Sequence, residues 1–206
     1  MGWLTKISKV VKKLIFKKNF IYLAIFSLIF LFLAFSYERS DSVLKRLDRE
    51  TIASNQQGVY KGNIAEDFQL LNSVGEKVSL SDFRGKKVII NFFATWCSPC
   101  QEEMPTLVQL DKEINDEKLV LLGINVTKEE RNVDDVRRFL NHYEVQYEVL
   151  YDGDGKVMKD YHLIGIPTTI FIDENGKIVE RLNGIVTMEM LLAHPFLQGL
   201  LNTNNR

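Results

Sequence analysis

The chain has 206 residues, of which 46% are apolar and 26% are charged, and its formal net charge is −1. This length fits one ordinary folded domain with a short appendage. The near-neutral charge gives no sign of a broad basic surface, so we expect no nucleic-acid partner.

The first 37 residues carry their charge differently from the rest. Residues 1–18 hold six lysines and no acidic residue, and residues 19–37 hold no charge at all. A helix of that second length, at about 1.5 Å per residue, spans close to the ~30 Å hydrocarbon core of a bilayer. We therefore predict a cytoplasmic basic segment over 1–18 and an uncleaved transmembrane signal-anchor over 19–37, in contact with the lipid bilayer. The lysines ahead of the anchor predict that residues 38–206 lie on the extracytoplasmic side of the cell membrane.

Two other interpretations of residues 19–37 remain open. A buried helix of a soluble domain is rarely apolar on every face over this length. A cleaved signal peptide would also begin with lysines, and residues 34–36 (AFS) offer a small-x-small cleavage site. The apolar run nevertheless exceeds the usual hydrophobic region of about 7–15 residues, which favours the anchor.

The remaining chain divides into a polar stalk over 38–61 and a compact domain over 62–206. The domain begins with an expected hairpin, in which strands 68–71 and 77–80 flank a turn. Apolar runs then predict strands over 87–93, 119–125, 148–151, 168–172 and 177–182. Amphipathic patterns predict helices over 101–114, 133–143, 156–162 and 188–201, the last with Pro195 in its middle. Alternating strands and helices indicate an α/β fold, and the closing hairpin makes its central sheet mixed.

Both cysteines lie between the strand over 87–93 and the helix that follows it, in the sequence Trp96-Cys97-Ser98-Pro99-Cys100. At a helix N-terminus, free N–H groups and the positive end of the dipole favour a thiolate. We therefore predict that Cys97 has a lowered pKa and is the nucleophile in thiol–disulfide exchange. Cys100 lies one turn further along, where it can resolve a mixed disulfide.

Two other uses of a cysteine pair fit the sequence less well. A structural zinc site usually needs four ligands, and the three histidines (His142, His162 and His194) show no ligand spacing. A disulfide that stabilises a fold usually closes a long loop, because the entropic gain grows with loop length. Residues 152–155 (DGDG) lack the ligand pattern of a calcium loop and are expected to form a surface turn. We expect no metal site and no cofactor.

A resemblance to the thioredoxin superfamily rests on residues 93–100 (FATWCSPC) and residues 165–169 (GIPTT). Residues 80–87 (LSDFRGKK) and 184–187 (GIVT) narrow it to the membrane-anchored thiol-disulfide oxidoreductases of the ResA/TlpA/CcmG type. The resemblance covers residues 62–201 and implies a thioredoxin-like fold with an N-terminal β-hairpin extension.

The same resemblance implies which residues bind substrate. It implies that Pro167 follows a cis peptide bond and packs against the cysteine pair, which leaves the backbone of Ile166 free to pair with an extended substrate. Trp96 and Pro99 are expected to belong to the same substrate-binding surface. An ordinary trans proline at the start of a strand is the alternative interpretation of Pro167.

Glu103 is a candidate acid–base group for the Cys100 thiol. Thioredoxin itself carries a buried aspartate on the preceding strand, but the matching position here is Asn91, which cannot take a proton. Spacing of i,i+3 places Glu103 on the helix face of Cys100, and ResA-like proteins similarly carry a glutamate there. Partial burial should raise the pKa of Glu103 toward working pH. The alternative, a charge on a solvated helix face, fits Glu102 better.

By resemblance, the expected activity is reduction of disulfides by the dithiol of Cys97 and Cys100. The expected substrate is the haem-attachment cysteine pair of apocytochrome c, and the expected electron donor is a CcdA- or DsbD-like membrane protein. An extracytoplasmic oxidant or isomerase, or a reductant of other envelope or sporulation proteins, would use the same residues. A non-catalytic redox sensor is a further alternative. A peroxiredoxin-like peroxidase is the last alternative, but the sequence does not contain the Pro-x-x-x-Thr-x-x-Cys loop that is typical of such enzymes.

Overall fold

A computed structural model of the chain describes residues 27–32, 35–36, 56–114 and 117–200. The chain divides into two compact units, residues 1–52 and 53–206. In the first unit, residues 27–32 and 35–36 are helical. The remainder of the predicted anchor over 19–37 and most of the predicted stalk over 38–61 lie outside the described residues. No helix within the described ranges is long and apolar enough to cross a membrane.

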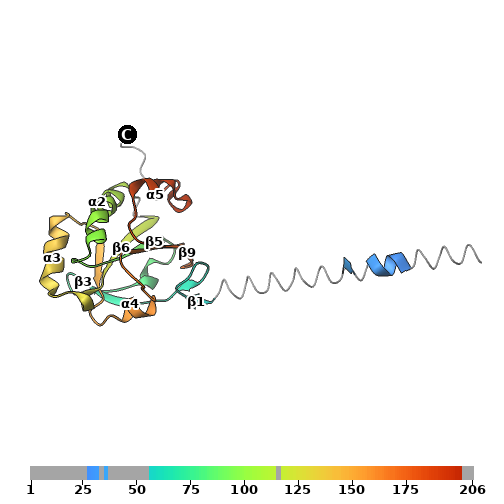
Figure 1. The fold of residues 1–206 in the computed structure, drawn as a ribbon, viewed down its shortest axis with the longest axis horizontal. Helices are drawn as coiled ribbons and strands as arrows, with labels where there is room; N and C mark the ends of the chain where they lie inside the picture. The colour runs from blue at the N-terminus through green and yellow to red at the C-terminus, as the bar shows by residue number, and fades with distance from the viewer. Residues whose placement is uncertain (1–26, 33–34, 37–55, 115–116, 201–206) are drawn as a thin grey trace, which may run out of the picture. The chain divides into compact units, whose positions relative to one another are not determined.

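A mixed seven-stranded sheet forms the centre of the second unit, with strand order β4-β3-β7-β6-β5-β8-β9 (Figure 1). Its middle strands β5, β6 and β7 are parallel, β8 and β9 run antiparallel to β5, and the β3–β4 hairpin joins β7 in antiparallel fashion. A short parallel pair, β1 and β2, lies before the hairpin in the chain. The strands are β1 (Gln57–Gly58), β2 (Ile64–Ala65), β3 (Gln69–Asn72), β4 (Lys77–Ser79), β5 (Lys87–Phe93), β6 (Leu119–Asn125), β7 (Glu148–Tyr151), β8 (Thr168–Ile172) and β9 (Ile178–Asn183).

The central strands are apolar at almost every position because both faces of the sheet are covered. Ile89 and Phe93 on β5 belong to one buried cluster, which α2 (Ser98–Glu113) and α5 (Met188–Ala193) complete. Ile90 and Phe92 belong to the cluster on the opposite face, which contains residues of the segment around α4 (Lys156–Asp160). Figure 1 shows α2 and α5 on one side of the sheet and α4 on the other. A continuous apolar run is the pattern expected for parallel strands buried in this way.

Local sequence sets the ends of the helices. Asn132 caps α3 (Val133–His142) by accepting a hydrogen bond from the N–H of Asp134, and Thr187 caps α5 through the N–H of Met190. Three short 3-10 helices complete the described elements: η1 (Leu80–Phe83), η2 (Thr127–Glu129) and η3 (Pro195–Leu197).

The structure differs from the predicted helices chiefly in two places, while α4 ends two residues before the predicted bound of 162. The single helix predicted over 188–201 is wrong, because α5 ends at Ala193 and η3 follows it. Pro195 cannot donate a backbone hydrogen bond and disfavours helical backbone in the residue before it, so the helix stops. The helix predicted from residue 101 begins earlier, at Ser98, because the Cys97 side chain caps it.

The turn at residues 152–155 is anchored from inside the fold. Its Gly153 and Asp154 are exposed, as expected for a surface turn, but Asp152 is buried. The Asp152 carboxylate accepts hydrogen bonds from the N–H groups of Val157 (3.3 Å) and Met158 (2.8 Å) in the first turn of α4. Asp152 therefore links the end of β7 to this short helix.

Candidate active site

The two cysteines form a disulfide at the N-terminus of α2, just beyond the carboxyl end of β5. Their Cα atoms lie 5.2 Å apart. Cys97 is 5% exposed and Cys100 is fully buried. A partner in exchange chemistry can therefore approach only Cys97, and Cys100 is placed to act from inside the fold.

The helix provides the electrostatic environment that favours a Cys97 thiolate. Cys97 is the N-cap residue of α2, and its Sγ accepts a hydrogen bond from the N–H of Cys100 at 3.3 Å. Pro99 occupies one of the first helical positions, where a missing N–H removes no intrahelical bond. The N-terminal end of the helix dipole and a directed N–H group both stabilise negative charge on this sulfur.

The loop before β8 supplies the other side of the site. The peptide bond between Ile166 and Pro167 is cis, as the resemblance implies. The carbonyl oxygen of Ile166 lies 3.7 Å from Cys97 Sγ. Pro167 is buried, and its carbonyl accepts a hydrogen bond from the N–H of Gly184. The structure thus brings Ile166 and Pro167 to Cys97 from 69 residues away in the chain.

Trp96 and Pro99 lie at the surface on the helix side of the site. The Trp96 side chain is 55% exposed, and its indole N–H donates to the carbonyl oxygen of Glu129 at 3.0 Å. Pro99 is exposed as well. Exposed apolar groups beside a buried sulfur form a surface that an apolar stretch of a protein substrate can cover.

Glu103 is fully buried, whereas its neighbour Glu102 is exposed. Its Oε1 accepts a hydrogen bond from Asn91 Nδ2 at 2.7 Å, and its Oε2 accepts one from the N–H of Val186 at 3.0 Å. Burial raises the pKa of Glu103 to about 7, although both hydrogen bonds act in the opposite direction. A carboxyl group with a pKa near 7, one helical turn from Cys100, can take up and release the proton of a thiol at neutral pH.

The structure also shows a contact that the sequence did not suggest. Glu130, just after η2, accepts hydrogen bonds from the backbone N–H and the hydroxyl group of Thr95, at 2.7 and 2.6 Å, and from Asn125 Nδ2 at 2.8 Å. Gln101 completes this arrangement by donating to the carbonyl oxygen of Thr95. The strand-to-helix junction that carries Cys97 is therefore fixed to the end of β6. Because 35 residues separate Glu130 from Thr95, no local sequence signal indicates the contact.

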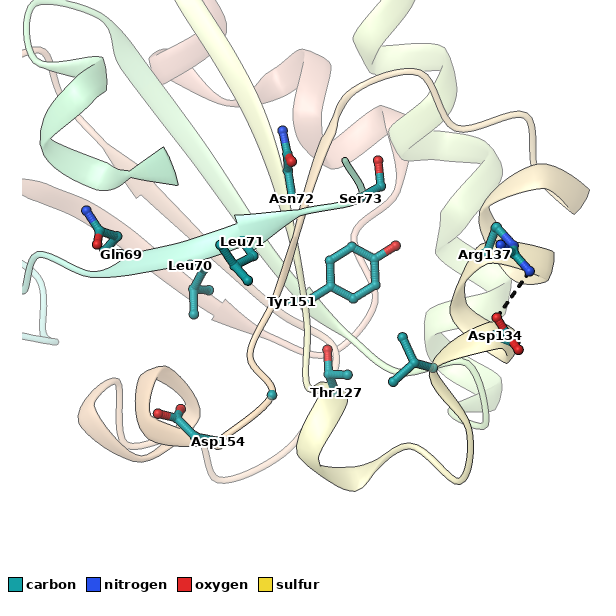
Figure 2. Close-up of a pocket in the computed structure, with 12 residues that line it drawn as sticks. Gln69, Leu70, Leu71, Asn72, Ser73, Thr127, Asp134, Arg137, Tyr151 and Asp154 are labelled. Atoms are coloured by element: carbon teal, nitrogen blue, oxygen red, sulfur yellow. Dashed lines mark hydrogen bonds and ion pairs between the residues drawn. The ribbon is translucent and has the colours of Figure 1, made fainter. Parts of the chain in front are cut away.

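A separate hollow of about 560 Å³ lies between β3, β7 and α3. Figure 2 shows Leu71 and Tyr151 beside it, together with the ion pair of Asp134 and Arg137. Neither cysteine lines this hollow, and neither does Glu103 or Pro167. Within the described part of the chain, no three His, Cys, Asp or Glu side chains gather closely enough to hold a metal ion.

Comparison with known proteins agrees with this geometry. Residues 61–181 match the sequence profile of the AhpC/TSA family. The chain belongs to this family. It is 40% identical over 138 residues to "Thioredoxin-like protein YneN" of Bacillus subtilis strain 168, a match that covers 67% of this chain and 80% of the relative. It is 30% identical over 138 residues to "Thiol-disulfide oxidoreductase ResA" of Bacillus cereus strain ATCC 10987, covering 67% and 78% respectively.

A solved structure extends the likeness to three dimensions. StoA from Bacillus subtilis matches with a TM-score of 0.55 and 31% identity, over 61% of this chain and 93% of that structure. The thioredoxin-like α/β fold, the cysteine pair and these relatives together establish the class of activity. This family member is a thiol-disulfide oxidoreductase of the ResA/DsbE type.

Proposed function

We propose that this protein is a membrane-tethered, extracytoplasmic reductase of protein disulfides, and that its substrate is the haem-attachment cysteine pair of apocytochrome c. The observation that carries the exchange chemistry is the buried Glu103, one helical turn from Cys100, because its pKa of about 7 allows it to take the Cys100 proton at neutral pH. The relatives named thiol-disulfide oxidoreductase ResA support the exchange chemistry. The reducing direction, the substrate and the tether are proposed from the resemblance of the sequence to the ResA/TlpA/CcmG type.

The proposed reaction has two exchange steps. The Cys97 thiolate attacks one sulfur of a substrate disulfide beside Pro167, which forms a mixed disulfide and releases the other substrate sulfur as a thiolate. Glu103 then takes the proton of the Cys100 thiol, and the Cys100 thiolate attacks Cys97 Sγ. The second substrate thiolate leaves, and the enzyme ends with the disulfide that the structure contains. Two electrons pass from the enzyme dithiol to the substrate.

Docking of the substrate is proposed to use the backbone of Ile166 and the exposed surfaces of Trp96 and Pro99. An extended peptide next to a free strand end gains main-chain hydrogen bonds irrespective of its sequence. The Cys-x-x-Cys-His segment of an unfolded apocytochrome offers such an extended chain, and haem attachment requires both of its thiols to be reduced.

The proposal also includes a membrane anchor for the enzyme and an electron donor that reduces its disulfide again. The uncharged segment over 19–37 is proposed to anchor the protein, and the described residues within it expose large apolar side chains such as Phe30 and Phe32. An electron donor of the CcdA or DsbD type in the same membrane is proposed to reduce the enzyme again. Confinement to one surface raises the effective concentration of both partners.

The reduction potential of the Cys97–Cys100 pair tests the direction of electron flow. We expect the full-length protein, equilibrated with defined dithiothreitol ratios, to give a potential near or below the value of about −270 mV that is typical of thioredoxin. A potential near about −120 mV, as in strong oxidants, would instead assign disulfide formation.

The substrate is tested with an oxidised apocytochrome peptide. We expect the reduced enzyme to open a Cys-x-x-Cys-His disulfide faster than the same disulfide in a peptide with scrambled flanking residues, and Cys97→Ser to open neither. Equal rates for the two peptides would argue against apocytochrome as the substrate.

Fractionation of cells that make residues 1–206 or residues 38–206 tests the anchor, since only the longer chain should sediment with membranes.

A further inference from the structure

The side chain of Glu103 belongs to a buried polar cluster with Asn91 and Thr169. Asn91 Nδ2 donates to Glu103 Oε1 at 2.7 Å and to Thr169 Oγ1 at 3.1 Å. All three residues are fully buried. Asn91 and Thr169 face each other directly in the pairing of β5 with β8, so the ladder fixes their separation.

One atom of this cluster has no partner. Asn91 Oδ1 is buried and accepts no hydrogen bond. Among the described residues, it is the one buried side-chain oxygen or nitrogen atom that lacks a hydrogen-bond partner. Buried oxygens without a partner are rare in folded proteins because their lost hydration is not replaced. The two ends of an asparagine amide have nearly the same size and shape. Half a turn about the Cβ–Cγ bond therefore exchanges them with little change in the volume that the side chain fills.

The two orientations of the amide suit different forms of Glu103. The ionised carboxylate only accepts hydrogen bonds, and the present orientation supplies it with the Asn91 N–H. The protonated carboxyl group carries an O–H that needs an acceptor, and the reversed amide would place Oδ1 there. The Thr169 hydroxyl group accepts from Nδ2 in the first orientation and can donate to Oδ1 in the second.

We propose that Asn91 is a positioning residue for the acid–base step. Its side-chain amide presents Nδ2 to ionised Glu103 and Oδ1 to protonated Glu103, and Thr169 retains the amide in both orientations. Asn91 thereby gives the Glu103 carboxyl group a hydrogen-bond partner both when it holds the proton and when it has released it.

This inference rests on the proposed function, in which Glu103 takes the Cys100 proton. In that step the S–H bond of Cys100 breaks, an O–H bond forms on Glu103, and the electron pair of the broken bond remains on sulfur. The amide reversal changes no covalent bond and supplies an acceptor for the new O–H group. The reverse rotation returns an N–H donor when Glu103 loses its proton.

Few other groups around Glu103 can ionise. Cys100 lies on the same helix, and Tyr147 precedes β7 and donates its phenol hydrogen to Met104 Sδ at 3.0 Å. Burial and the negative charge of Glu103 both raise the pKa of Tyr147, so this phenol stays protonated throughout the working range of pH. The strands contribute the neutral Asn91 and Thr169, and the segment before α5 contributes the Val186 N–H. The Asn91 amide is therefore the neutral group whose rotation can follow the Glu103 proton.

Nuclear magnetic resonance of the oxidised full-length protein, in which neither cysteine titrates, tests the proposal. The Glu103 carboxyl carbon reports the proton, and Overhauser contacts from the Asn91 side-chain N–H protons to Thr169 report the amide orientation. We expect these contacts above the Glu103 midpoint and their loss below it. Glu103→Gln should leave the Asn91 contacts independent of pH.

Two variants extend the test to catalysis. Asn91→Leu removes both ends of the amide at similar volume. The ionised carboxylate then loses a charge-assisted hydrogen bond and the protonated carboxyl group loses a weaker neutral one, so the pKa of Glu103 should rise by about one pH unit, a tenfold change in its ionised fraction. The pH midpoint for resolution of the mixed disulfide should rise by the same amount. Thr169→Val preserves the side-chain shape and should shift both midpoints in the same direction. It keeps the test available if Asn91→Leu does not fold.

The outcomes separate the two proposals. If the Glu103 carboxyl titrates while the Asn91 contacts stay constant, the amide reversal is refuted and the role of Glu103 stands. Unchanged midpoints in both variants would also refute the positioning role. If Glu103 does not titrate between about pH 5 and pH 9, the acid–base step itself is wrong.

Discussion

Glu103 shows how the protonation of one buried side chain becomes part of the stability of the fold. Its pKa is raised from an ordinary value of 4.5 to about 7 by loss of hydration. The folded protein therefore binds this proton more tightly than the unfolded chain does. The resulting stabilisation is complete below about pH 4.5 and is lost as the pH rises through 7.

We predict that this loss is measurable as a difference between the parent protein and Glu103→Gln. A pKa difference of this size corresponds to about 3 kcal/mol in the free energy of unfolding. Urea unfolding of the oxidised proteins between pH 4.5 and 8 should show the parent losing about that much relative to the variant. Other groups titrate in both proteins and cancel in the comparison. Parallel stability curves would contradict the prediction.

At the scale of residues, the sequence predicted the groups whose spacing is local. The positions of Cys97 and Cys100, and the helix face of Glu103, follow from a cysteine pair at a strand-to-helix junction. The partners of Glu103 do not follow in this way, because Asn91 and Val186 lie 12 and 83 residues from it. Only the packing of the sheet against α2 brings such groups together.

At the scale of elements, α4 depends on a residue outside its own sequence range. The helix has five residues, too few to be stable alone, and its N-cap Gly155 offers no side chain. Asp152 supplies the missing acceptor by binding two N–H groups of the first turn. The end of β7 therefore holds the start of the helix.

We predict that Asp152→Ala lowers the free energy of unfolding by about 1–2 kcal/mol, because it leaves one buried and one partly buried N–H group without an acceptor. Asp152→Asn should cost less, since its amide oxygen still accepts. Asp160→Ala is the matched control, because it removes only an ion pair with the fully exposed Lys156 and should leave stability almost unchanged. Chemical denaturation of the three variants provides the measurement. Equal losses in Asp152→Ala and Asp160→Ala would contradict this account of the cap.

Element boundaries were predictable where hydrophobic pattern alone decides them. The predicted bounds of β5, β6, β7 and β8 are confirmed, because continuous apolar runs end where the strands leave the buried layer. The ends of α2 and α5 depend instead on individual backbone groups. Cys97 caps α2, and Pro195 stops the chain from continuing α5, effects that periodicity does not report.

At the scale of the whole domain, the sheet separates two buried clusters. Ile89 and Ile90 are neighbours in the chain, but Ile89 belongs to the cluster under α2 and Ile90 to the cluster on the opposite face. Ile170 lies directly opposite Ile90 on β8 and shares its cluster. Alternation along a strand thus assigns adjacent residues to different cores.

We predict that this separation governs how substitutions combine. Ile89→Val and Ile90→Val should each cost about 0.5–1.5 kcal/mol, and the double variant should cost their sum within about 0.5 kcal/mol. The control pair, Ile90→Val with Ile170→Val, changes two touching side chains and should deviate from additivity by about 0.5 kcal/mol or more. Denaturant unfolding of the six proteins, including the parent, measures both couplings. Non-additivity of the Ile89 and Ile90 pair alone would show that strain crosses the sheet.

The position of Trp96 has a spectroscopic consequence. It is one of two tryptophans in the chain, it adjoins Cys97, and the hydrogen bond to Glu129 holds its indole ring in place. A disulfide accepts an electron from an excited indole nearby and so quenches its emission, whereas a pair of thiols quenches it much less. Oxidation of the cysteine pair in each turnover should therefore lower the Trp96 fluorescence, and reduction by the electron donor should restore it. The fluorescence intensity then reports the fraction of enzyme molecules in the reduced form.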